Sequence, residues 1–132
     1  SKAVKIMLDN GVNINNITIS SDGQGSLPQF DNNGNLIGLT TGKVTSIHES
    51  IKEMHLNEGI PYDIAIKTVT SNPSKIFKLY NKGNLRHGLD ADITILNKKD
   101  LSVNTVISKG KLMIKNGDVI VKGLNSLSNT YI

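Results

Sequence analysis

Residues 17–26 contain the side chains best suited to carry chemistry. Residues 17–20 (Ile-Thr-Ile-Ser) alternate apolar and polar side chains, which is the period of a β-strand, and Asp22 follows where this segment stops. A carboxylate at the carboxyl end of a strand is a candidate metal ligand or proton carrier. Gly23 and Gly25 allow the loop to adopt positive φ and to approach a ligand closely.

The same residues also have an ordinary structural interpretation. An Asp-Gly pair after a short apolar segment is typical of a tight turn. Ser26, at the end of the loop, can equally be a loop serine whose hydroxyl is satisfied by solvent. The residues alone leave both interpretations open.

The composition limits the class of protein. The 132 residues are the length of one domain, and 37% hydrophobic but only 4% aromatic residues require a core of Ile, Leu and Val. The absence of cysteine excludes disulfides and thiolate zinc sites and favours a reducing compartment, so we expect a cytoplasmic protein. The sequence shows no signal peptide and no apolar run that would span a bilayer, so we expect no membrane partner.

The charge is distributed unevenly along the chain. Residues 1–66 contain four lysines and seven acidic residues, whereas residues 67–132 contain eleven basic and four acidic residues. A basic half could contact nucleic acid. However, Arg86 is the only arginine, and no aromatic residues alternate with the lysines to stack on bases. We therefore predict a solvated lysine-rich surface and no nucleic-acid partner.

The apolar spacing predicts helices before and after a long polar loop, followed by strands. Ser46 and Glu49 have the spacing of a capping box at the start of the central helix, which Gly59 would end. Asn116-Gly117 is a strong hairpin signal. The predicted helices cover residues 2–10, 46–58, 61–69 and 72–79, the loop covers 21–42, and the strands cover 17–20, 92–96, 103–108, 111–115 and 118–122.

Two histidines of the central helix could suggest a metal site. His48 and His55 lie seven residues apart, whereas a His-Glu-x-x-His zinc motif would need its second histidine at the position of Lys52. We therefore expect both histidines to face solvent.

The loop after residue 20 resembles the end of the barrel in isoaspartyl dipeptidases, zinc peptidases of the amidohydrolase superfamily that cleave β-aspartyl dipeptides. The Ser-Asp-Gly-x-Gly-Ser run at residues 21–26 points to this branch, and the resemblance covers nearly the whole chain. Gly-x-Asp-Ala-Asp at residues 88–92 and Gly-Lys-x-x-x-x-x-Gly at residues 110–117 are general to amidohydrolases. The remaining matches are Pro28, Phe30-Asp31, Gly34-Asn35-Leu36, Gly42, residues 70–73, Lys82-Gly83 and Asp92-Ile93.

The resemblance implies an α/β fold. Residues 1–81 would form the last α/β unit of a (β/α)8 metal-dependent hydrolase barrel, with strand 8, a substrate loop and closing helices. Residues 82–132 would form the C-terminal strands of a small flanking β-domain. The chain would then be the last third of an enzyme, which would leave the apolar Ile17 and Ile19 uncovered. We expect such a chain to associate, and the enzyme to be a homo-oligomer.

The resemblance also implies two site residues. Asp22 matches an aspartate that contacts one zinc of a binuclear site, takes a proton from the metal-bridging water and passes it to the leaving amine. Ser26 matches a serine that hydrogen-bonds the carboxylate of the dipeptide. The family's metal-binding histidines and its metal-bridging modified lysine lie on earlier strands, outside this chain.

Two functions remain open at this point. The first is a fragment of a zinc-dependent peptidase that hydrolyses β-aspartyl dipeptides. The alternative is a non-catalytic scaffold or interaction chain, a split or degenerate amidohydrolase without the metal site. The intact run at residues 21–26 favours the enzyme, and the missing metal ligands favour the inactive chain.

Overall fold

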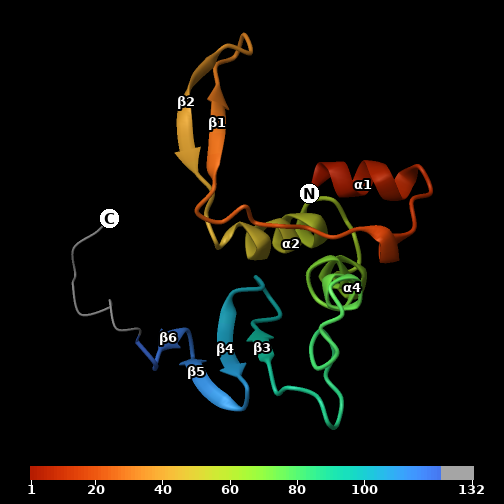
Figure 1. Ribbon diagram of the computed structural model, residues 1–132, viewed down its shortest axis with the longest axis vertical. Helices are drawn as coiled ribbons and strands as arrows, with labels where there is room; N and C mark the ends of the chain where they lie inside the picture. The colour runs from red at the N-terminus through yellow and green to blue at the C-terminus, as the bar shows by residue number, and fades with distance from the viewer. Residues whose placement is uncertain (123–132) are drawn as a thin grey trace. The chain divides into compact units, whose positions relative to one another are not determined.

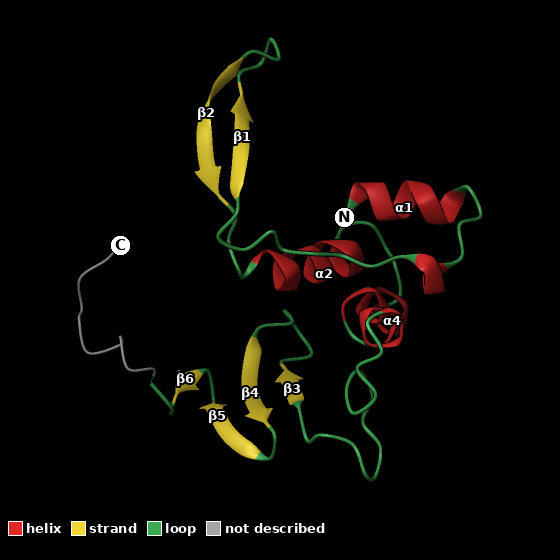
Figure 2. Ribbon diagram, viewed as in Figure 1, coloured by secondary structure: helices red, strands yellow, loops and turns green. Residues whose placement is uncertain are grey.

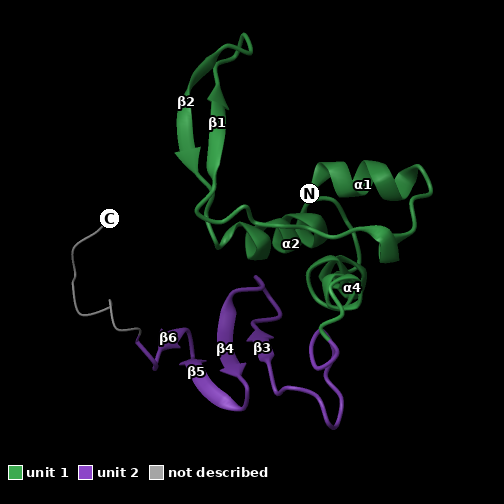
Figure 3. Cartoon of the chain, in the orientation of Figure 1, with its two compact units in different colours: residues 1–79 green, residues 80–132 purple. Residues whose placement is uncertain are grey.

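The computed structural model describes residues 1–122, which form helices and antiparallel strands in two compact units (Figure 3). Unit 1 covers residues 1–79 and unit 2 covers residues 80–132. The sequence predicts a barrel end over 1–81 and a β-domain over 82–132, and this assignment of the parts stays a prediction. Residues 123–132 of that predicted domain lie outside the described residues.

Unit 1 contains the helices and one β-hairpin (Figures 1 and 2). None of the helices within residues 1–122 is long and apolar enough to cross a membrane. The elements are α1 (Lys2–Asp9), the 3-10 helix η1 (Ile14–Asn16), β1 (Ser26–Phe30), β2 (Leu36–Thr41), α2 (Ser46–Leu56), α3 (Tyr62–Ala65), the 3-10 helix η2 (Ile66–Val69) and α4 (Ser71–Ile76).

The core of unit 1 consists of aliphatic side chains from the helices and from the segment before the hairpin. In α2, Ile51 and Met54 lie three residues apart, on one face of the helix, and both are buried. Val4 of α1 and Ala65 of α3 are buried with them, as the apolar spacing predicts.

Residues 17–20 are extended but do not form the predicted strand. Ile17 has φ −106° and ψ 129°, which is β geometry, yet no strand among the described residues pairs with this segment. A strand needs a neighbour to complete its hydrogen-bond ladder. The backbone N–H of Ile19 instead donates to the carbonyl of Thr68, at 3.1 Å. The expectation that Ile17 and Ile19 lie uncovered is wrong, because Ile17 is buried and Ile19 packs against the same core.

The predicted loop over residues 21–42 is also wrong, because it contains an antiparallel hairpin that stands away from the helices of unit 1 (Figure 1). Ser26 pairs with Thr41 at its base. At its tip, the carboxylate of Asp31 accepts the backbone N–H of Asn33 at 2.8 Å and the backbone and side-chain N–H groups of Asn35 at 2.9 and 3.0 Å. The bond from the Asn35 side chain is the main reason why the pKa of Asp31 is lowered.

Two predictions about α2 need correction. Thr45 occupies the N-cap and Ser46 is the first helical residue, so Ser46 and Glu49 do not form a capping box. The hydroxyl of Ser46 instead donates to the carbonyl of Ser21 at 3.3 Å. His55 does not simply face solvent, since its Nδ1 lies 3.0 Å from the carbonyl oxygen of Ile60 and its ring meets Tyr62 edge-on.

Unit 2 contains a four-stranded antiparallel sheet in the order β3-β4-β5-β6. The strands predicted over residues 103–108 and 111–115 are confirmed as β4 (Val103–Ser108) and β5 (Lys111–Lys115). The other two are shorter than predicted: β3 covers Ile93–Leu96, and β6 covers only Asp118–Val119.

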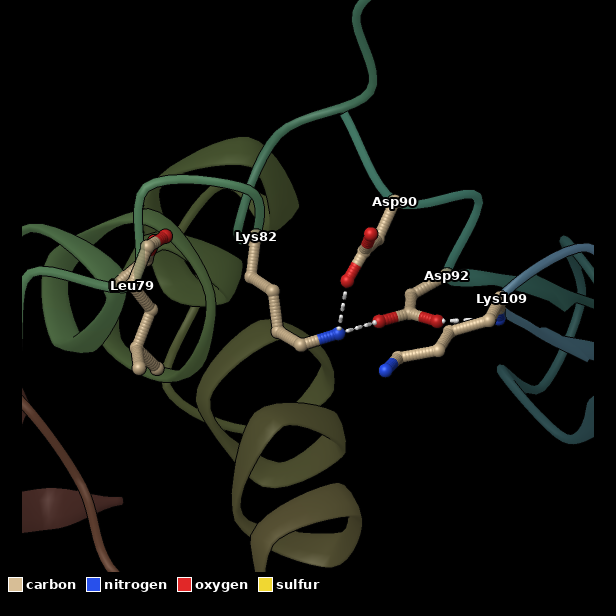
Figure 4. Close-up of polar contacts among 6 residues, drawn as sticks. Leu79, Lys82, Asp90, Asp92 and Lys109 are labelled. Carbon is tan, nitrogen blue, oxygen red and sulfur yellow. Dashed lines mark hydrogen bonds and ion pairs between the residues drawn. The ribbon is translucent and has the colours of Figure 1, made fainter. Parts of the chain in front are cut away.

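A cluster of charged side chains joins the start of β3 to the turn after β4 (Figure 4). Lys82 Nζ pairs with Asp90 Oδ2 at 2.8 Å and with Asp92 Oδ2, while the backbone N–H of Lys109 donates to Asp92 Oδ1 at 2.7 Å. The Lys82 ammonium holds the pKa of Asp92 below its usual value. The Gly-x-Asp-Ala-Asp run therefore has a structural role within unit 2.

Candidate active-site loop

Asp22 lies in the loop that connects the extended segment to β1. Its own backbone is left-handed, with φ +45°, and so is that of Gln24, whereas Gly23 and Gly25, which were expected to adopt positive φ, do not. The hydroxyl of Ser20 donates to Asp22 Oδ1 at 3.1 Å and accepts the backbone N–H of Asp22 at 3.2 Å. One serine therefore contacts both the backbone and the carboxylate of the residue to which we assign chemistry.

The loop turns back on itself immediately after Asp22. The N–H of Gly25 donates to the carbonyl of Asp22 at 2.8 Å, and this closes a turn from Asp22 to Gly25. Gly42, which follows β2, accepts the N–H of Gln24 at 2.8 Å and donates to the carbonyl of Gly25 at 2.9 Å. Both ends of the hairpin thus meet at the Asp22 loop.

The start of α2 lies against the same loop. A Cβ added at Gly23 would lie 2.8 Å from a methyl carbon of Val44, two residues before α2, so one of the two would have to shift. The bond from the Ser46 hydroxyl to the Ser21 carbonyl connects the loop to the first residue of the helix. Residues on both sides of the hairpin therefore determine the path of residues 21–25.

The Asp22 carboxylate is exposed and retains capacity for a ligand. An ionised carboxylate offers about four acceptor positions, and the bond from Ser20 uses one of them. Asp22 can therefore accept a proton, receive a hydrogen bond from a substrate or contribute one oxygen to a metal.

Ser26 is the first residue of β1 and is also exposed. Its cross-strand partner is Thr41. Ser26 directly follows the turn that begins at Asp22, so the two predicted site residues belong to one short stretch of chain, and no hydrogen bond joins their side chains among those of the described residues. Their roles as catalytic and substrate-binding residues stay predictions.

The described residues do not form a metal site by themselves. No group of three or more His, Asp or Glu side chains within residues 1–122 lies close enough to hold an ion. A catalytic zinc takes about three protein ligands and a water, and Asp22 supplies one carboxylate. The donor set of this chain therefore does not fit a complete zinc centre.

Ser20, Gly42 and Asn72 support the loop and lie in stretches that match the family pattern, yet sequence reasoning assigned none of them a role at the site. Ser20 lies two positions before Asp22, a spacing that allows a serine hydroxyl to meet the next-but-one N–H. Gly42 carries no local signal, because its neighbour in space is 20 residues away in the chain. The Asn72 amide donates to the carbonyls of Ile14 and Ile17, which lie 58 and 55 residues earlier in the chain.

Comparison with known proteins agrees with this architecture. The profile of the Amidohydrolase family matches residues 1–113. A structure of the beta-aspartyl dipeptidase of Fervidobacterium islandicum in complex with a beta-Asp-Leu dipeptide is 39% identical, with a TM-score of 0.80 over 93% of this chain and 32% of that one. A second structure of that name from the same organism is 32% identical, with a TM-score of 0.75 over 93% of this chain and 29% of that one.

Curated relatives extend the range of similar proteins beyond peptidases. The dihydroorotase of Methanosphaera stadtmanae is 34% identical over 58 residues, which is 42% of this chain and 14% of that protein. The allantoinase of Bacillus velezensis is 29% identical over 105 residues, which is 75% of this chain and 23% of that protein. The chain therefore spans about a third or less of the proteins to which it is similar, 32% of the dipeptidase structure and 23% of the allantoinase. Because the family profile extends over most of its length, this α/β chain belongs to the amidohydrolase family.

Proposed function

We propose that this chain is the C-terminal part of a metal-dependent peptidase that hydrolyses β-aspartyl dipeptides. The observation that carries the proposal is the similarity to a beta-aspartyl dipeptidase structure, with 39% identity and a TM-score of 0.80 over 93% of the chain. Similarity at this level over nearly the entire chain favours a shared substrate class over a shared scaffold alone.

Asp22 would carry the proton in this reaction. Water attacks the carbonyl carbon of the β-aspartyl amide, and Asp22 accepts the proton that the water loses. When the C–N bond breaks, Asp22 donates the proton to the leaving amine nitrogen and returns to its ionised form. Its exposed position, with one oxygen held by Ser20, leaves the second oxygen available for this transfer.

Ser26 would bind a part of the substrate that does not react. Its hydroxyl can donate to a carboxylate of the dipeptide, and the turn that begins at Asp22 would set the distance between the bound carboxylate and the reacting amide. This arrangement uses Ser26 for binding and Asp22 for chemistry.

The metal of the complete enzyme would be zinc, in a binuclear site. Members of the amidohydrolase family generally use metal ions. Asp22 would contribute one ligand, and the others would come from parts of the protein outside this sequence. We further propose a cytoplasmic homo-oligomer that binds neither nucleic acid nor membranes, in keeping with the absence of cysteine and with a single arginine.

The test is hydrolysis by the complete protein that carries this sequence, loaded with zinc and assayed on β-Asp-Leu, α-Asp-Leu, allantoin and dihydroorotate. We expect cleavage of β-Asp-Leu, and a loss in kcat of about a thousandfold or more for Asp22→Asn, because an amide cannot accept the proton. Asp118→Asn, which alters an exposed carboxylate of β6, is the matched control.

Either of two results would reject the proposal. The first is near-normal turnover by a fully metallated Asp22→Asn variant. The second is no hydrolysis of β-Asp-Leu by the metallated wild-type protein. Cleavage of allantoin or dihydroorotate instead would assign the protein to another substrate class within the family. Inactivity on the whole panel, together with failure to bind zinc, would favour the non-catalytic scaffold.

A further inference from the structure

We propose that Ser20 and Gly42 are positioning residues for Asp22, Ser20 through its carboxylate and Gly42 through its backbone. This inference rests on the proposed function, because it assigns to them an effect on proton transfer by Asp22. Neither residue needs to contact the substrate.

Ser20 acts on the side chain of Asp22. Its hydroxyl donates to Oδ1 at 3.1 Å and accepts the backbone N–H of the same residue at 3.2 Å. A hydroxyl is the smallest side-chain group that both donates and accepts. The pair of bonds links the carboxylate to its own backbone and so limits rotation of the Asp22 side chain.

Gly42 acts on the backbone of Asp22. Gly42 is buried, and a Cβ added there would lie 2.2 Å from the carbonyl oxygen and 2.9 Å from the carbonyl carbon of Asp22. Real Cβ atoms do not approach other atoms so closely, so any side chain at position 42 must displace Asp22. The same approach allows the bonds from Gln24 to Gly42 and from Gly42 to Gly25.

The two contacts together connect the hairpin to the chemistry. Gly42 comes directly after β2, so the pairing of β1 with β2 determines where Gly42 lies against the backbone of Asp22. Asp22 has left-handed backbone geometry, with φ +45°, which its neighbours must maintain. An error of about 1 Å in a reacting group can cost about a hundredfold in rate.

The test is a set of variants of the complete zinc-loaded protein, with kcat and KM measured on β-Asp-Leu. We expect Ser20→Ala to lower kcat about three- to tenfold with little change in KM, and Ser20→Thr, which keeps the hydroxyl, to restore it. Gly42→Ala should lower kcat at least about tenfold. Gly38→Ala is the control, because a Cβ at that position of β2 would meet only the end of the Gln29 side chain, at 3.7 Å.

The decisive measurement is the combination with Asp22→Asn. If Ser20 and Gly42 act through Asp22, adding Ser20→Ala or Gly42→Ala to Asp22→Asn should lower kcat no further. A merely structural role would reduce the activity of Asp22→Asn by the same factor as that of the wild type. Should Gly42→Ala fail to fold, Gly25→Ala applies a milder displacement, since its Cβ would lie 3.0 Å from the same carbonyl oxygen.

The outcomes separate this inference from the proposed function. Full activity of Asp22→Asn would reject the role of Asp22 itself. Loss of activity in Asp22→Asn with normal kcat for Ser20→Ala, Gly42→Ala and Gly25→Ala would leave the function intact and reject the positioning residues. Additive losses in the double variants would reject them as well.

Discussion

Asn72 Nδ2 donates a hydrogen bond of 2.8 Å to the carbonyl oxygen of Ile17, a residue 55 positions earlier in the chain. The same nitrogen donates to the carbonyl of Ile14, also at 2.8 Å. With the bond from Ile19 to the carbonyl of Thr68, these contacts hold the segment that leads to Asp22. Contacts from Thr68 and Asn72 thus position the segment of chain that precedes the candidate site.

Asn72→Asp should destabilise the protein, because it replaces the donating amide with a carboxylate that faces two carbonyl oxygens. Asn72 is 5% exposed, so water cannot readily replace the lost bonds. Leaving buried polar groups unsatisfied costs about 1–3 kcal/mol each. We expect a loss of about 2–4 kcal/mol in the free energy of unfolding, measured by denaturant titration of the complete protein. Asn33→Asp, at the exposed hairpin tip, should change it by less than about 0.5 kcal/mol.

The hairpin shows why part of the fold could not be predicted. The turn residues Lys109-Gly110 and Asn116-Gly117 revealed β4 and β5, since each of these strands pairs with a neighbour close in sequence. In β1 and β2 the pattern is broken by Pro28 and Gly38, and the segment reads as a polar loop. The turn residues Asp31 to Asn35 were the available signal, because an Asp followed by Asn and Gly is typical of a tight turn.

The ion pair of Lys82 and Asp92 should make the stability of unit 2 depend on pH. The Asp92 pKa is lowered in the folded protein, first by the bond from Lys82 and then by that from the Lys109 backbone. A group with a lowered folded pKa adds stability above its unfolded pKa and loses that contribution as pH falls through the folded value. The stabilisation should therefore be complete at neutral pH and disappear on acidification below about pH 4.

Asp92→Asn tests this dependence, because its amide oxygen can still accept the N–H of Lys109 while the charge is lost. The melting temperature of the variant should lie below that of the wild type at pH 7, and the difference should narrow as the pH falls below about 4. Salt should reduce the difference at pH 7, since both side chains are more than a third exposed, at 40% and 37%. Asp118→Asn should show no such trend, and a constant gap across the pH range would contradict the ion-pair explanation.

Ser26→Ala should weaken substrate binding rather than the chemical step. A hydrogen bond to a charged group contributes about 1.5–3 kcal/mol, so kcat/KM on β-Asp-Leu should fall roughly ten- to a hundredfold, mostly through KM. Thr40→Ala is the control, since Thr40 pairs with Leu27 and thus lies on the opposite face of the hairpin from Ser26. Unchanged kinetics across a full substrate titration would remove Ser26 from the site.

The candidate site divides in the same way into parts that the sequence reveals and parts that it does not. Asp22 and Ser26 lie four residues apart, so one motif contains both. Ser20 is also a local neighbour of Asp22, two positions away, whereas the clash of a Cβ at position 42 with the Asp22 carbonyl is visible only in the folded chain. A local motif therefore contains the residues to which we assign the chemistry and its local partner Ser20, whereas the role proposed for Gly42 requires the tertiary structure.

Residues 1–132 expressed alone should neither bind zinc tightly nor hydrolyse β-Asp-Leu. Within residues 1–122 no cluster of ligands could hold the ion. A catalytic zinc takes about three protein ligands, and Asp22 supplies only one carboxylate. The isolated chain should also associate, because its hairpin exposes Phe30, Leu36 and Leu39 at 58%, 61% and 68%. Elemental analysis, light scattering and a dipeptidase assay on the purified chain test all three expectations. A monodisperse monomer with stoichiometric zinc and dipeptidase activity would show that this chain is a complete catalytic unit and would reject the fragment interpretation.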